Sequence, residues 1–145
     1  SKGLGAPIGS VMLSTKERVT KARVWRKRYG AGMRQVGLLA AAGHYALDHN
    51  IAPLAEDHRR AKEIAVALNA IVPSVIDPAT VQTNIVGLDL AELNITAAEL
   101  ATRCKAEGLL IGALGPKYAR LVTHLDIDDA GTAYAIEVLK RALVA

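Results

Sequence analysis

The sequence predicts a mixed α/β chain of the α+β kind, ending in a small domain with a three-stranded sheet and helices on one face. Residues 84–143 follow the order strand, helix, strand, strand, helix, which is typical of such a domain. Three helical stretches precede them, and a proline-containing segment, 71–80, separates the two parts. We therefore divide the chain into residues 1–52, a connecting helix within 53–72, and a small domain, 73–145.

Composition narrows the possible functions. The 145 residues are 51% hydrophobic but only 3% aromatic, with no Phe, which predicts a core of small aliphatic side chains. The net charge of +4 suits an anionic small ligand or a nucleic acid. The single cysteine, Cys104, excludes an internal disulfide and is consistent with a reducing compartment such as the cytoplasm. No apolar run reaches the length of about 18 residues that a membrane span needs, and no spacing of His, Cys and carboxylates predicts a metal site.

The first ten residues combine one lysine with several small residues. Lys2 has no charged neighbour, and Gly3 and Gly5 let a ligand approach the backbone closely. Such a lysine suits a Schiff base with a carbonyl cofactor such as pyridoxal phosphate. The alternative is a solvated lysine in a glycine-rich loop. Residues 8–13 (IGSVML) then predict a short strand.

A basic helix is predicted over 16–28, with Ser14-Thr15 as its cap. Seven cations oppose the lone Glu17: Lys16, Arg18, Lys21, Arg23, Arg26, Lys27 and Arg28. The pattern fits a solvated face, a phosphate site or an RNA-binding edge.

Residues 30–32 (GAG) break this helix, and Arg34 precedes a second one over 36–47 that is apolar nearly all round. Such a helix is expected to be buried on every side, inside a large protein or between subunits. Its N-terminal amides and the Arg34 guanidinium together favour a phosphate or a carboxylate.

The remaining elements are predicted from periodicity and caps. A structural helix covers 54–68, and strands cover 84–90, 109–113 and 120–124. Thr96 and Glu99 form a capping box for a helix that ends at Gly108. Either Asp126 or Asp128 caps a last helix that runs to about residue 143. We interpret Cys104 as core, and the four histidines as packing or structural residues: His44, His49, His58 and His124.

Three stretches, taken together, carry a family resemblance: residues 1–10 (SKGLGAPIGS), 30–35 (GAGMRQ) and 118–126 (YARLVTHLD). With residues 55–58 (AEDH), they resemble the C-terminal part of the low-specificity L-threonine aldolases, pyridoxal-phosphate enzymes of the aspartate-aminotransferase fold (type I). The likeness runs over almost the whole chain, and its mild departures include Ala31 in the middle of the glycine triplet. It implies that 1–52 ends a large cofactor-binding domain whose N-terminal part is missing. The chain alone is then expected to be inactive, and the complete protein a cytoplasmic homodimer or homotetramer.

The resemblance also implies roles for four residues. Lys2 is expected to be the Schiff-base lysine, and Arg120 to bind the substrate α-carboxylate. Arg34, with Lys27, is expected to bind the phosphate of pyridoxal phosphate, in a neighbouring subunit across a dimer interface. The implied reaction is retro-aldol cleavage of L-threonine or L-allo-threonine to glycine and acetaldehyde, with no nucleic-acid or membrane partner. The motifs do not identify the base that removes the hydroxyl proton.

Two rival functions stay open. One is another lyase or racemase of fold type I that acts on a β-substituted amino acid through the same lysine. The other is a basic nucleic-acid-binding or interaction module built on residues 16–34, which explains the charge but gives no role to Arg120 or to the opening loop.

Overall fold

The computed structural model describes residues 2–144, and of Lys2 the backbone only. These residues form two compact units, which divide between Ile51 and Ala52. The first unit holds a 3-10 helix, η1 (Lys2–Leu4), and helices α1 (Lys16–Arg28) and α2 (Gly37–His49). The second unit holds α3 (Leu54–Asn69), a 3-10 helix η2 (Pro78–Thr80), β1 (Ile85–Asp89), α4 (Ala97–Ala106), β2 (Gly112–Gly115), β3 (Tyr118–Val122) and α5 (Asp129–Val144).

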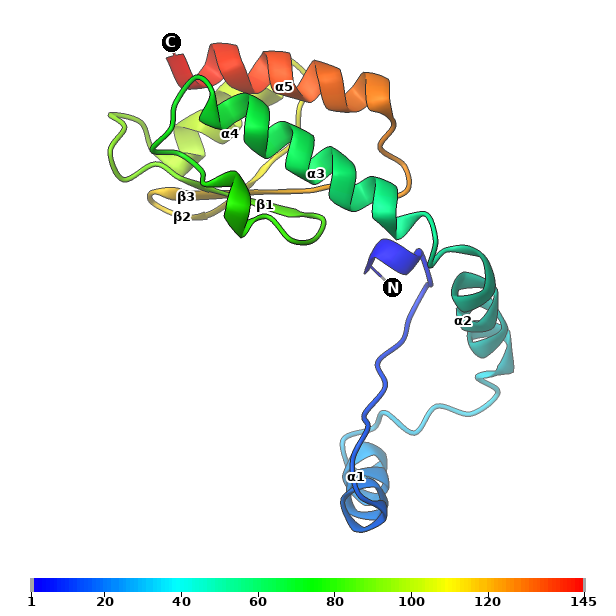
Figure 1. Cartoon of the computed structure of the whole chain (residues 1–145). Coiled ribbons are helices and arrows are strands. Elements are labelled where there is room, and N and C mark those ends of the chain that lie inside the picture. The colour runs from blue at the N-terminus through cyan, green and yellow to red at the C-terminus, as the bar shows by residue number, and fades with distance from the viewer. Residues whose placement is uncertain (1, 145) are drawn as a thin grey trace. The chain divides into compact units, whose positions relative to one another are not determined.

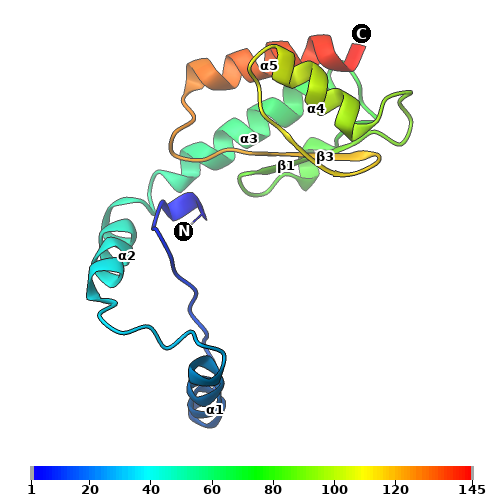
Figure 2. The same cartoon turned by 180° about the vertical axis from the view of Figure 1, so that it is seen from behind.

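The three strands form one antiparallel sheet in the order β1-β3-β2, so β3 is the central strand. Figures 1 and 2 show α3, α4 and α5 over the same face of this sheet. This arrangement confirms the predicted fold class of a small sheet with helices on one face. The helix α3 belongs to this unit, since it packs against β1 and α5.

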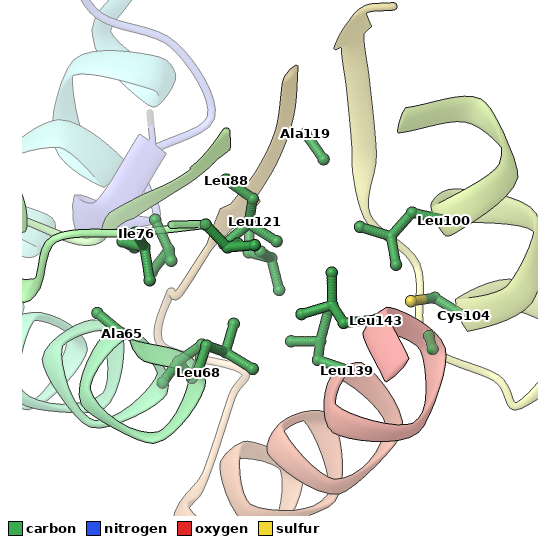
Figure 3. Close-up of a cluster of buried hydrophobic side chains, with 14 of the residues drawn as sticks. Ala65, Leu68, Ile76, Leu88, Leu100, Cys104, Ala119, Leu121, Leu139 and Leu143 are labelled. Atoms are coloured by element: carbon green, nitrogen blue, oxygen red, sulfur yellow. The ribbon is translucent and has the colours of Figure 1, made fainter. Parts of the chain in front are cut away.

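The core lies between the three helices and the covered face of the sheet. Figure 3 shows side chains from all these elements in one cluster, among them Leu68, Leu100, Leu121 and Leu139. The buried hydrophobic side chains are aliphatic or, at Cys104, a thiol, as the aromatic-poor composition predicts. Small aliphatic residues such as Ala65 and Ala119 let the helices and strands approach closely.

Local signals fix several helix ends where the sequence predicts them. The Thr96 hydroxyl accepts the N–H of Glu99 at 3.2 Å, and the Glu99 carboxylate accepts the N–H of Thr96 at 2.7 Å, so the capping box is confirmed. The helix α4 ends at Ala106, and its C-terminal cap, Glu107, is followed by Gly108, which has a φ of +80°. There the N–H of Leu109 bonds to the carbonyl of Cys104, as in a Schellman motif. At α5, it is Asp128 whose carboxylate accepts a helical N–H, that of Gly131.

Two predicted strands are displaced along the chain, and a third does not form. The strand expected over 109–113 is β2 at 112–115, because Leu109 takes part in the end of α4. The strand expected over 120–124 is β3 at 118–122, which follows a tight turn at Pro116 and Lys117. Residues 8–13 form no strand, since the first unit offers no partner strand among its described residues.

The helix α2 forms where it is predicted, but its surroundings differ from the expectation. Of its residues only Ala46 is buried, while Leu38 is 83% exposed. The described part of the first unit supplies no second layer over this helix, so its apolar surface stays open. Within residues 2–144, no helix combines the length and the apolar character that crossing a membrane requires.

We expect Leu100→Ala to lower the free energy of unfolding by about 2–5 kcal/mol, because Leu100 is fully buried in the core and its loss leaves a cavity. Leu110→Ala is the matched control, since Leu110 is 77% exposed and the same truncation there should cost about 0.5 kcal/mol or less. Urea denaturation followed by circular dichroism measures both. Equal losses in the two variants would contradict the assignment of the core.

We expect the Cys104 thiol to be unreactive in the native protein. The side chain is fully buried, and burial raises the pKa of the thiol to about 11, so very little thiolate forms at pH 8. A chromogenic disulfide reagent should label the native protein slowly and the denatured protein at once. Since the chain has one cysteine, rapid labelling of the native protein would show that this part of the core opens readily.

Candidate active site

The predicted cofactor lysine lies at the start of the first unit. The backbone of Lys2 opens η1, but its side chain lies outside the described residues, so its contacts stay a prediction. The loop that follows is attached to α2, because Asn50, the C-terminal cap of α2, donates a hydrogen bond to the Leu4 carbonyl at 2.8 Å. Between residues 4–11 and α2 lies a cavity of about 330 Å³ whose lining includes Gly43 and His44.

Lys27 folds back over the loop that joins α1 to Arg34. A Cβ atom placed on Gly32 would lie 2.7 Å from Cδ of Lys27 and 3.4 Å from its Nζ. The lysine stem therefore occupies the space that any other residue at position 32 would fill. This contact brings the Lys27 ammonium next to the loop that carries Arg34, and no described residue forms an ion pair with either cation.

Arg34 stands before the start of α2. The following residue, Gln35, has a φ of +48°, a left-handed conformation that costs a non-glycine residue about 1–3 kcal/mol. The N-terminal cap of α2 is Val36, whose side chain offers no hydrogen bond to the first helical amides. Arg34 is exposed. The N-terminus of α2, which follows Arg34 in the chain, carries the partial positive charge of the helix dipole.

Arg120 lies in the middle of the central strand of the second unit. Along β3, Ala119 and Leu121 are buried, while Tyr118, Arg120 and Val122 are exposed. Since strand side chains alternate, these three share the face of the sheet that the helices leave open. No described residue forms a hydrogen bond or an ion pair with the Arg120 guanidinium, so both of its outer edges are available to a carboxylate.

Both residues directly opposite Arg120 are glycines, Gly87 on β1 and Gly112 on β2. Residues paired across antiparallel strands put their side chains on the same face, so neither residue opposite Arg120 places a side chain of its own beside the arginine. These two glycines are not among the site residues predicted from the sequence. The signal was a glycine inside each strand-like stretch, which indicates the close approach of another group.

The other candidate residues have structural surroundings. The ring of His49 stacks on Tyr45, and its Nδ1 lies 2.9 Å from the Tyr45 carbonyl oxygen. His124 Nδ1 lies 3.4 Å from a carboxylate oxygen of Asp126. On α1, the Trp25 and Tyr29 rings stack at 5.7 Å and the Arg28 guanidinium lies over Trp25. Within residues 2–144, no three His, Cys, Asp or Glu side chains are grouped so that they could hold a metal ion.

Comparisons with known proteins agree on one family. A family model described as beta-eliminating lyase matches residues 1–91. The probable low-specificity L-threonine aldolase 2 of Arabidopsis thaliana is 39% identical over 97% of this chain and 40% of its own length. The low specificity L-threonine aldolase of Escherichia coli K12 is 43% identical over 88% of this chain and 36% of its own length. Aldolase vrtJ of Penicillium aethiopicum is 36% identical over 99% of this chain and 36% of its own length.

This chain therefore spans no more than about 40% of the length of these relatives. The family model nevertheless covers more than half of the chain, including the opening loop, α1, α2 and β1. The chain belongs to the beta-eliminating lyase family, whose members depend on pyridoxal phosphate.

Proposed function

We propose that this chain is part of a pyridoxal-phosphate enzyme that cleaves L-threonine or L-allo-threonine to glycine and acetaldehyde. The observation that carries the proposal is Arg120, an exposed cation without an acidic partner among the described residues and with a glycine on each side. An amino-acid substrate offers the carboxylate that such an arginine binds through two parallel hydrogen bonds. The relatives named as threonine aldolases support the reaction class.

The residues of the first unit fit the cofactor. A pyridoxal phosphate needs an amine for its aldehyde and cations for its phosphate. Lys2 would supply the amine, and Lys27 and Arg34 would bind the phosphate. Gly32 supports this assignment, because its missing side chain is what allows Lys27 to lie against the Arg34 loop. The cofactor, when bound, supplies a sink for the electrons that the breaking Cα–Cβ bond releases.

The residues of this chain would contribute binding and orientation. The Arg120 guanidinium would hold the α-carboxylate and thereby orient the amino acid. The ε-nitrogen of Lys2 would be the atom to which the cofactor is covalently attached. Cleavage also removes the β-hydroxyl proton and adds a proton at Cα. We assign the removal of the hydroxyl proton to no residue of this chain.

The organisation of the complete enzyme is part of the proposal. Residues 1–52 would belong to a cofactor-binding domain, 53–72 to a connecting helix, and 73–145 to a small domain, and protein outside this chain would complete the site. In a homodimer or homotetramer, Arg34 would reach the cofactor phosphate of a neighbouring subunit. The open apolar surface of α2 supports such an interface.

We expect Lys2→Ala to remove the visible absorbance of the full-length protein purified with pyridoxal phosphate. The covalent attachment of the cofactor to an amine produces that band, and glycine should shift it in the unaltered protein. Lys21→Ala is the control, because Lys21 is exposed and bonded to Glu17. Absence of a band in the unaltered protein, even with added cofactor, would argue against the function.

We expect Arg120→Lys to raise the KM for L-threonine about 10- to 100-fold, because lysine lacks the planar fork that holds a carboxylate at two points. Steady-state kinetics on the full-length protein measure the change. Arg141→Lys is the control, since Arg141 pairs with Glu107 on the surface. An unchanged KM in Arg120→Lys would remove Arg120 from the site.

A second candidate function is RNA binding on α1, which the exposed stack of Trp25, Tyr29 and Arg28 favours. Binding of this kind should weaken steeply with salt. A titration with single-stranded RNA at two salt concentrations, comparing the unaltered protein with Trp25→Ala, separates the two functions. Family membership favours the enzyme, since RNA binding gives no role to Arg120.

A further inference from the structure

Tyr118 covers one of the two glycines that face Arg120. A Cβ atom on Gly87 would lie 2.3 Å from Oη of Tyr118, 3.0 Å from Cζ and 3.1 Å from Cε2. The distance to Oη is shorter than a real Cβ contact, and the other two are tight, so the end of the phenol ring occupies the space above Gly87. Tyr118 therefore extends across β1 and lies beside the position directly opposite Arg120.

The two sides of Arg120 are consequently different. On the β1 side, the Tyr118 ring fills the space above Gly87. On the β2 side, a Cβ atom on Gly112 would meet only the Arg120 carbonyl oxygen at 3.5 Å and Cδ2 of Leu114 at 4.0 Å, both ordinary contacts. The open face thus has an aromatic wall on one side of the arginine and free space on the other.

We propose that Tyr118, seated on Gly87, is a positioning residue for Arg120 that sets the orientation of its guanidinium for a carboxylate. The proposal rests on the proposed function, since it takes an amino-acid carboxylate as the ligand. Tyr118 and Arg120 are two residues apart on the same face of β3, so a ring that crosses β1 limits the rotamers open to the arginine on that side.

The Tyr118 ring can lie over β1 only because position 87 is a glycine. Its φ lies outside the left-handed region, so the backbone accepts alanine and the steric conflict with Tyr118 is what opposes it. Gly87→Ala should push the phenol ring off β1 and toward Arg120. Gly115→Ala adds the same methyl group at the end of β2, where a Cβ atom would meet nothing within 4 Å, and is the matched control.

The test compares five full-length proteins: unaltered, Gly87→Ala, Gly115→Ala, Tyr118→Ala and the double variant Gly87→Ala/Tyr118→Ala. We expect Gly87→Ala to raise the KM for L-threonine and the Kd for glycine about tenfold, with kcat within about twofold, because the carboxylate is bound equally in the ground and transition states. Gly115→Ala should change KM by less than about threefold. Tyr118→Ala should raise KM, and the double variant should match it.

Thermal unfolding of the same proteins is the readout that does not depend on activity. Gly87→Ala should lower Tm, because the added methyl group clashes with the Tyr118 ring. In the double variant the clash is absent, so its Tm should lie above the value expected from adding the two single changes. This non-additivity of the Tm changes reports the contact between positions 87 and 118 directly. The double variant removes the conflict, so it should fold even where Gly87→Ala alone does not.

Two results would overturn the proposal. One is an unchanged KM in Gly87→Ala. The other is a double variant whose fold-change in KM equals the product of the fold-changes of Gly87→Ala and Tyr118→Ala, since Gly87 would then act independently of Tyr118. If Arg120→Lys leaves the glycine affinity unchanged, the proposed function itself fails, whatever the Tm values show about the Tyr118 contact.

Discussion

The pairing of β3 with a strand on each side is the interaction on which the second unit depends. β3 is bonded to β1 along its whole length and to β2 on its other edge, so it sets the register of the sheet. The same register buries Ala119 and Leu121 under the helices and leaves Arg120 on the open face. A slip of one residue would exchange Arg120 for Leu121, so the core and the candidate site are determined together.

The parts of the fold that the sequence predicts well depend on neighbouring residues. Thr15 caps α1, and Thr96 with Glu99 caps α4, because the groups that bond lie within four positions of one another. The predictions that depend on distant segments were weaker. Residues 8–13 have the composition of a strand but no partner strand within the described part of the first unit, and β2 starts three residues later than expected because the end of α4 uses Leu109.

In the candidate site, too, the predictions that rest on local sequence were possible and those that depend on distant segments were not. Lys2, Arg34 and Arg120 could be named because they lie in short motifs that resemble those of a known family, and Lys27 because it lies close to Arg34 in the sequence. The residues that surround Arg120 were not predictable, since they follow from cross-strand register and from an irregularity in β2 between Ala113 and Gly115. Gly32 was seen only as a helix breaker, because its contact with Lys27 depends on the path of the loop in three dimensions.

The aliphatic core has a consequence for any study of how this protein unfolds. The single tryptophan, Trp25, belongs to the first unit, and the two tyrosines of the second unit, Tyr118 and Tyr134, are on its surface. Tryptophan fluorescence therefore reports on α1, and the second unit has no tryptophan of its own. The one reporter inside the second unit's core is the sulfur of Cys104, so the two units carry separate natural probes, an indole for one and a thiol for the other.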